Sequence, residues 1–276
     1  MEGESFIPKD SSLHAALVAA AEGTRCIVFA GLPGIGKSLL TRQTGLIARG
    51  MGRAVTLMQW DPVRAAFEQH PVGRGFPDTA GVAHPAIRVA ADDWVRAGVA
   101  RWLANGGPSA LLIVEAPLIG GRMMSLARHA EDGVEAFLAA ETVFVLPVPT
   151  LEVKQTLRGR RSDDAARDAS RPFASVDVLD RLVAEINGIA ASIGAVVTPP
   201  ADYDPEAYSA VYQHAMRRRR SRIVSIDQVF EIRDGMPAGS DPPAVLPTDE
   251  EMVVAFEAAA RLPADAVEER LRRWYD

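Results

Sequence analysis

The residues best suited to chemistry form one continuous glycine-rich stretch: Gly31, Leu32, Pro33, Gly34, Ile35, Gly36, Lys37, Ser38 and Leu39. The spacing Gly-x-x-x-x-Gly-Lys-Ser is typical of loops that bind nucleotide phosphates. Glycines let the backbone curl so that successive N–H groups point at phosphate oxygens, and a helix that starts there adds its dipole. We expect Lys37 to reach the β- and γ-phosphates of ATP and the Ser38 hydroxyl to bind Mg²⁺.

Two carboxylates follow apolar runs further along the chain. Phosphoryl transfer to an alcohol needs a carboxylate that orients the attacking oxygen and takes its proton, and we expect Asp61 to be that base. The competing interpretation is that Asp61 caps a helix, because Pro62 would stand at its first position. Glu115 ends a fully apolar run, where an acidic side chain could hold Mg²⁺ through water or polarise the attacking group.

Arginines accompany these carboxylates. Arg64 follows Asp61 at Asp-x-x-Arg spacing, so both side chains share one side of a helical turn. Arg64 could hold an acceptor phosphate or the transferring group, and it could equally be a surface arginine or a partner of Asp61. Arg158, Arg160 and Arg161 could close over the triphosphate and neutralise charge in the transition state. Nearby aspartates also allow these three to be a solvated charged face.

Two other arginine positions carry weaker signals. The loop after Glu115 would bring Arg122 close to the same site. Residues 217–220 are four consecutive arginines. A helix C-terminus favours such a run, so we expect a solvated helix end in preference to a nucleic-acid contact.

The elements that must position these residues alternate between apolar runs and helical patterns. We expect strands at 26–30, 54–60, 111–114, 143–147 and 195–198. Strands buried on both faces and separated by helices predict a parallel sheet in a three-layer α/β/α fold. Ligand-binding residues then belong at the carboxyl ends of the strands, where the glycine-rich loop and both carboxylates fall.

The remaining segments are assigned by periodicity and composition. Helices are expected at 11–22, 39–49, 63–70, 86–105, 121–139, 176–193, 203–220, 248–262 and 263–275. Residues 71–85 are rich in glycine and proline, and a loop of that length in a compact domain is usually functional. Residues 222–226 are interpreted as either an edge strand or part of a hinge.

Composition limits the class of protein. A chain of 276 residues suits one large α/β domain, with or without an appendage. A net charge of −6 argues against a general polyanion-binding surface. One cysteine excludes a disulfide framework and favours a reducing compartment, and the scattered histidines lack metal-ligand spacing. No apolar run approaches the length of a membrane span, so we expect a cytoplasmic protein without membrane attachment.

The chain up to the fifth expected strand resembles the P-loop kinase group. That group includes nucleoside and nucleotide kinases, shikimate-type kinases, chloramphenicol phosphotransferase, zeta toxins and polynucleotide 5′-kinases. The resemblance rests on the P-loop at 31–38, Asp61-Pro-Val-Arg64, Glu115 and the arginines after the fourth strand. It implies that Asp61 is the base, that Arg64 contacts the acceptor or a phosphate, and that the three later arginines form a lid. It also implies that residues 198–201, after the fifth strand, line the adenine.

The sequence departs from this group in two places. Glutamate replaces the commoner aspartate at the third strand, and the extension after residue 222 matches no particular family. We therefore divide the chain into a P-loop kinase-like domain, 1–222, and a C-terminal extension, 223–276, composed of a mobile linker and two helices.

The leading hypothesis is an ATP- and Mg²⁺-dependent kinase that transfers the γ-phosphate to a hydroxyl of a small-molecule or nucleoside-like acceptor. The acceptor would lie between Asp61, Arg64, the loop 71–85 and the helix 86–105. An acidic chain favours a small acceptor over a 5′-hydroxyl nucleic-acid end, which remains an alternative. An alternative from another class is a nucleotide-dependent switch or adaptor that hydrolyses ATP slowly and acts through its C-terminal helices. The oligomeric state is not indicated by the sequence.

Overall fold

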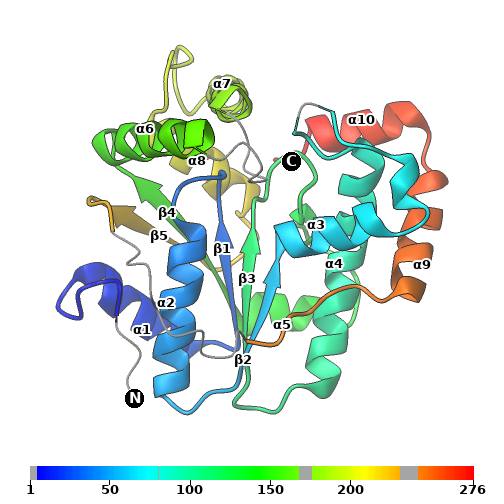
Figure 1. Cartoon of the computed structure of the whole chain (residues 1–276), viewed down its shortest axis with the longest axis horizontal. Helices are drawn as coiled ribbons and strands as arrows, with labels where there is room; N and C mark the ends of the chain where they lie inside the picture. The colour runs from blue at the N-terminus through cyan, green and yellow to red at the C-terminus, as the bar shows by residue number, and fades with distance from the viewer. Residues whose placement is uncertain (1–4, 80, 168–175, 231–241) are drawn as a thin grey trace.

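The computed structural model describes residues 5–79, 81–167, 176–230 and 242–276. Within these residues the chain forms one five-stranded sheet, in which every pair of neighbouring strands is parallel and the strand order is β2-β3-β1-β4-β5 (Figure 1). The strands are β1 (Cys26–Ala30), β2 (Val55–Gln59), β3 (Leu111–Ala116), β4 (Thr142–Pro149) and β5 (Ser221–Ile226). The α/β class and the parallel five-stranded sheet predicted from the sequence are confirmed.

The central strands form because their side chains are apolar on both faces of the sheet. Every residue of β1 and β4 is buried. Alternate side chains of β1 enter different hydrophobic clusters, with Ile27 in one and Val28 in the other. Both faces therefore need a layer of helices, as expected for a parallel sheet.

One face is covered by α1 (Ser12–Gly23), α2 (Lys37–Gly50) and α6 (Leu151–Arg167). Helix α1 begins where the Ser11 hydroxyl accepts a hydrogen bond from the His14 backbone N–H at 3.1 Å. Leu17 from this helix and Leu40 from α2 pack with Ile27 of the sheet. The burial of these apolar side chains thus fixes the position of α2 against the sheet. It also fixes the position of the glycine-rich loop that joins β1 to α2.

The other face is covered by more numerous elements of very different lengths. They are α3 (Trp60–Gln69), η1 (Gly73–Gly75), α4 (Pro85–Asn105), η2 (Met124–Leu126), α5 (Glu135–Ala140), α7 (Val176–Ser192), α8 (Pro205–Ala215), α9 (Asp249–Ala260) and α10 (Ala264–Arg272). Their apolar side chains share one hydrophobic cluster with alternate residues of the sheet. Among the helices of the described ranges, none is both long and apolar enough to cross a membrane.

The fifth strand is β5, and the prediction of a strand at 195–198 is wrong. Val197 is fully exposed. The Asn187 side chain donates hydrogen bonds to the carbonyls of Pro200 and Asp202, at 2.8 and 2.7 Å, which hold this segment as an irregular connection. Strand β5 lies at the sheet edge beside β4, and its burial is partial, so its apolar signal in the sequence is weak.

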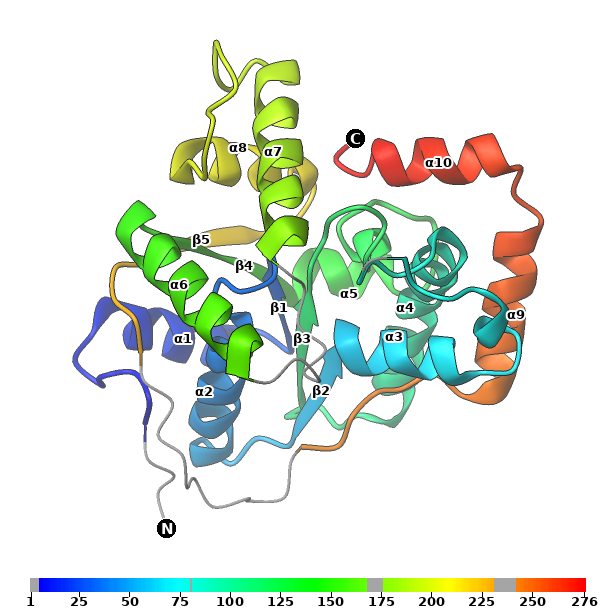
Figure 2. The ribbon, with the colours of Figure 1, turned by 45° about the horizontal axis from the view of Figure 1, so that its top comes forward.

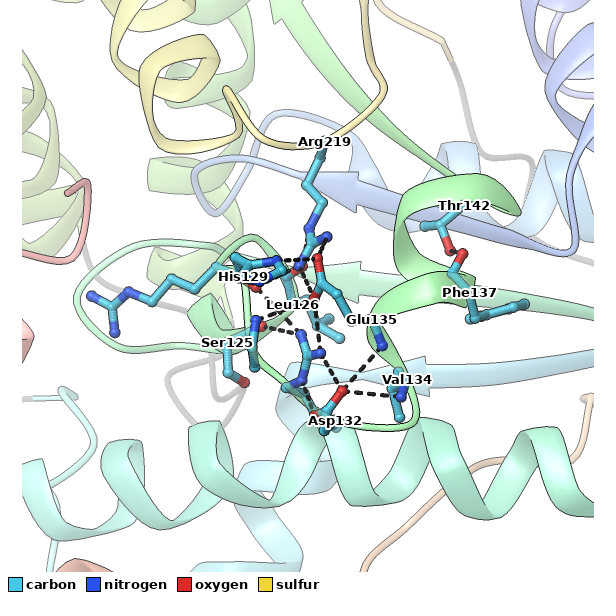
Figure 3. Close-up of polar contacts among 12 residues, drawn as sticks. Ser125, Leu126, His129, Asp132, Val134, Glu135, Phe137, Thr142 and Arg219 are labelled. Carbon is cyan, nitrogen blue, oxygen red and sulfur yellow. Dashed lines mark hydrogen bonds and ion pairs between the residues drawn. The ribbon is translucent and has the colours of Figure 1, made fainter.

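The helix predicted at 121–139 is also wrong, because only η2 and α5 are helical there. Gly120, Gly121 and Met123 have positive φ angles of 56°, 79° and 60°, which a helix cannot accommodate. Beyond them the backbone is held by an ion-pair network rather than by helical hydrogen bonds (Figure 3). Tertiary contacts thus override the local helical pattern.

This network surrounds Glu135. The carboxylate pairs with Arg219 at 2.6 Å and with Arg96 at 3.0 Å, while Arg96 also pairs with Asp132 at 2.6 Å. Arg219 also donates to the Leu126 carbonyl at 2.9 Å, and its side chain is 0% exposed. The helix predicted at 203–220 ends at Ala215, so the arginines at 217–220 follow the helix, and Arg219 among them is buried instead of solvated.

The C-terminal helices pack into the same core as the sheet. Phe256 of α9 packs edge-on against Phe67 of α3, with ring centroids 5.4 Å apart. Glu251 closes a capping box with Thr248 at the start of α9 and accepts the Trp94 indole N–H at 2.9 Å. The helices predicted at 248–262 and 263–275 are thus confirmed, and residues 231–241 of the predicted linker lie outside the described residues.

Candidate functional site

The glycine-rich loop connects the buried strand β1 to helix α2 at the carboxyl end of the strand. Its three glycines, Gly31, Gly34 and Gly36, have positive φ angles of 132°, 75° and 91°. This region is disfavoured for other residues, so the pattern in the sequence reflects a backbone that only glycine adopts without strain. Gly36 is also the N-cap of α2 and offers no side-chain cap, which leaves the first N–H groups of the helix available to a ligand.

Gly31 is required for a second reason. A Cβ atom at this position would lie 2.2 Å from the Tyr208 hydroxyl oxygen and 2.4 Å from Ile35 Cδ1. Tyr208 belongs to α8 and is completely buried. Burial raises the pKa of Tyr208 well above its usual range, so the phenol beside the loop is neutral.

Lys37 lies inside the loop rather than in solvent. Its side chain is buried, and Nζ donates hydrogen bonds of 2.8 Å to the carbonyls of both Gly31 and Leu32. An ammonium group bonded to neutral carbonyls makes stronger hydrogen bonds when an anion replaces them. Lys37 is therefore positioned to contact an anion that enters the loop.

Ser38 and Glu115 meet although they are 77 residues apart in the sequence, with Ser38 Oγ donating to Glu115 Oε1 at 2.8 Å. The other carboxylate oxygen accepts the Gln59 side-chain amide at 3.0 Å. Gln59 ends β2 and is paired in register with Glu115 of β3. Sequence reasoning missed Gln59, whose only signal was its place at the end of a strand.

These side chains fit a magnesium ion as two oxygen donors. Mg²⁺ prefers oxygen ligands in octahedral geometry and usually keeps several waters, with phosphate oxygens completing its shell. No group of three or more His, Cys, Asp or Glu residues that could hold a metal is found in the described ranges. The ion would therefore be held by Ser38 and Glu115 together with oxygens that the chain does not supply.

Asp61 is the second residue of α3, and the helix N-cap is Gln59. The interpretation of Asp61 as an N-cap is therefore wrong, because the helix starts one residue earlier than Asp61. The carboxylate is exposed at the end of β2, in the first turn of the helix, where the helix dipole favours a negative charge.

Arg64 is engaged by two carboxylates. Its guanidinium pairs with Glu68 at 2.6 Å and with Asp78 at 3.1 Å. The second contact ties α3 to the loop 71–85, whose described residues include the turn η1 and an isolated bridge between Thr79 and Val82. Arg64 thus fixes the position of this loop.

The arginines expected in a lid lie on α6, which begins directly after β4. Arg158 pairs with Asp180 of α7 at 2.6 Å, and both side chains are about half exposed, at 52% and 50%. Arg160 is exposed on the same helix, and the Arg161 side chain falls outside the described residues. Figure 1 shows α6 and α7 above the arrowheads of β1 and β4, at the carboxyl ends of these strands.

The proposed adenine contact at 198–201 loses its basis, because this segment follows α7 and not a strand. The segment that follows the fifth strand is 227–230, and the chain beyond it to residue 241 lies outside the described ranges.

Comparison of the chain with protein-family models finds no match, and comparison with curated proteins also finds none. The function of the site is therefore inferred from the chemistry and geometry of its own residues.

Proposed function

We propose that the protein is an ATP- and Mg²⁺-dependent phosphotransferase that moves the γ-phosphate to a hydroxyl group of a small-molecule acceptor. The observation that carries this proposal is the loop 31–38, with three positive-φ glycines, a buried Lys37 and a Ser38 hydroxyl 2.8 Å from Glu115. The glycines expose backbone N–H donors, Lys37 supplies a cation, and Ser38 and Glu115 supply oxygen ligands for Mg²⁺. A bound nucleoside triphosphate needs all three.

Lys37 and the start of α2 would bind the phosphates. The backbone N–H groups of the first helical turn would donate to phosphate oxygens, and the helix dipole would favour their negative charge. Lys37 Nζ would exchange its carbonyl partners at Gly31 and Leu32 for phosphate oxygens.

Ser38 and Glu115 would hold Mg²⁺, and Gln59 would keep the Glu115 carboxylate oriented through its 3.0 Å hydrogen bond. When bound, Mg²⁺ neutralises negative charge on the phosphates and polarises the transferred group. Arg158 and Arg160 on α6 would add positive charge from the far side of the site.

Asp61 would act as the base. The β2–β3 pairing places the ends of these two strands side by side, with Glu115 opposite Gln59. Asp61 lies two residues beyond Gln59, in the first turn of α3. An exposed carboxylate there can orient the acceptor hydroxyl and accept its proton as the oxygen attacks the γ-phosphate.

The test measures ATP consumption with Mg²⁺, with and without pools of nucleosides, amino sugars, hydroxylated antibiotics, sugar phosphates and 5′-hydroxyl oligonucleotides. We expect one pool to stimulate turnover and Asp61→Asn to reduce the stimulated rate by about 100-fold or more. Asp265→Asn is a matched control, because Asp265 is an exposed carboxylate at the second position of α10.

Other outcomes would contradict the proposal. ATP turnover that ignores every pool and is unchanged in Asp61→Asn would favour the switch or adaptor, and failure to bind ATP would remove both. Stimulation by oligonucleotides with a steep salt dependence would point to a nucleic-acid kinase instead of a small-molecule kinase.

A further inference from the structure

A cavity of about 320 Å³ lies between four segments of the chain that sequence reasoning did not connect. They are the region around the start of α4, the loop after β3, and the helices α7 and α10. The charged residues of its wall are Arg88, Arg122, Arg181, Glu185 and Arg272. Arg272 is paired with Glu269 next to this wall, so three guanidinium groups stand against one carboxylate and the lining is net positive.

Arg88 and Arg122 converge on one point of this wall. Arg88 Nη1 donates to the Gly120 carbonyl at 3.1 Å, and Arg122 Nη1 donates to the Ile119 carbonyl at 3.2 Å. A Cβ atom at Gly120 would lie 3.1 Å from Arg122 Nη1 and 3.2 Å from Arg88 Nη1. The absence of a side chain at Gly120 therefore lets the two cations approach each other over the backbone.

The charge of this pair is only partly compensated within the described residues, where burial lowers the pKa of both arginines and Glu185 opposes this with a smaller effect. In the described ranges, neither Arg88 nor Arg122 has a carboxylate within ion-pair distance, and Arg88 Nε is buried without a hydrogen-bond partner. Glu185 accepts the Trp274 indole N–H at 2.8 Å. Burial, followed by the neighbouring Arg88, lowers the pKa of Arg122 to about 10, so the group still carries its charge at neutral pH. Holding two like charges together in a half-buried place costs free energy, which an anion would recover.

We propose that this cavity binds the phosphate group of a phosphorylated small molecule. A phosphate monoester is a dianion near neutral pH and matches the two converging guanidinium groups, whose planar forks suit phosphate oxygens. Arg181, exposed on α7, adds a third cation at the wall. The size of the cavity is within the range of small-molecule sites, and its apolar residues Val82 and Leu271 can contact a carbon skeleton.

The description of this ligand as the acceptor rests on the proposed kinase function. The cavity includes Val82 and Arg88, from the loop and helix expected to surround the acceptor, and Arg122 follows β3, the strand that carries Glu115. The acceptor would then already carry one phosphate and receive a second on a free hydroxyl.

Helix α10 completes the cavity, which gives the C-terminal extension a role. Leu271 packs directly on Gly121, where a Cβ atom would lie 2.3 Å from Leu271 Cδ2. Arg270 pairs with Asp92 at 2.7 Å and with Asp93 at 2.5 Å, which fastens α10 to α4. Figure 2 shows α10 turning back from the end of α9 toward α7.

The test uses the full chain with Lys37→Ala, so that the glycine-rich loop lacks its cation, and titrates inorganic phosphate by calorimetry. We expect phosphate to bind at least about ten-fold more tightly than acetate. Arg122→Met and Arg181→Met should each weaken phosphate binding about ten-fold or more, which is the effect of losing a charged hydrogen bond. Arg218→Met, which removes an exposed arginine outside the cavity, should leave it unchanged.

Three results would overturn the proposal: no phosphate binding, equal binding of acetate, or phosphate binding that is insensitive to both substitutions. Arg181 is exposed, so Arg181→Met is expected to fold and keeps the test decisive if Arg122→Met does not. The titration needs no ATP. Phosphate binding to the Lys37→Ala chain, together with no ATP use by the wild type, would therefore refute the proposed kinase alone. ATP use by the wild type without phosphate binding at the arginines would refute only this inference.

Discussion

Replacement of Arg219 by methionine should destabilise the protein by about 3 kcal/mol, the lower end of the cost of breaking a buried ion pair. Methionine fills the space of the aliphatic stem but donates no hydrogen bonds, so the Leu126 carbonyl loses the 2.9 Å contact from Arg219 Nε. Glu135 keeps Arg96 at 3.0 Å and His129 at 2.9 Å, which is why we expect the lower end of the range (Figure 3).

The effect should depend on pH in a defined direction. Arg219, ahead of any other group, holds the pKa of Glu135 well below its usual range. A carboxyl whose pKa is lowered by folding stabilises the native state above its unfolded pKa, about 4.3, and this contribution is lost as the pH falls toward the folded value. The advantage of the wild type over Arg219→Met should therefore be complete at pH 7 and shrink below about pH 4.

The assay is urea unfolding followed by circular dichroism at several pH values. Arg218→Met is the matched control, because Arg218 is the exposed neighbour in the same run and should cost no more than about 0.5 kcal/mol. If Arg219→Met cost less than about 1 kcal/mol, or no more than the control, the buried network would not be what holds residues 121–135 in place.

Two further predictions concern strand β1 and the first glycine of the loop that follows it. Gly31→Ala should destabilise the protein by about 1–3 kcal/mol in urea unfolding and weaken ATP binding, because its Cβ would overlap the Tyr208 hydroxyl, whereas Gly23→Ala, with nothing within 4 Å, should have little effect. An equal effect of both substitutions would contradict the steric argument. Burial raises the pKa of Cys26 to about 12, so at pH 8 the native thiol should resist iodoacetamide and react only after unfolding, as measured by mass spectrometry. The same shift stabilises the native state below the unfolded thiol pKa of about 8.5, and this contribution is lost as the pH rises toward 12. Rapid labelling of the folded protein would show that β1 opens readily.

Local features of the site could be predicted from the sequence because they depend on near neighbours. The glycines at 31, 34 and 36 indicate a backbone of positive φ, and apolar runs predict strands buried on both faces. The meeting of Ser38 and Glu115 also followed, since the carboxyl ends of parallel strands share one edge of the sheet.

Local patterns misplaced the start of α3 and left the fifth strand open, since the edge strand found at Ser221–Ile226 was only one of two interpretations of residues 222–226. The run 195–198 is apolar, but nothing in the sequence shows that Asn187 holds the following segment away from the sheet. Only a few side chains of an edge strand such as β5 are buried, so the apolar pattern of its sequence is weak.

The sequence by itself determined the α/β alternation, the conformation of the glycine-rich loop and the carboxylates at the strand ends. Only the tertiary structure decided that Gln59 supports Glu115, that Arg219 is buried against Glu135, and that Arg88 converges with Arg122. The physical reason is that a charged side chain has the same appearance in the sequence whether water or a distant residue surrounds it. Contacts across long separations, such as the 93 residues from Leu126 to Arg219, form only when the packing of whole helices brings the groups together.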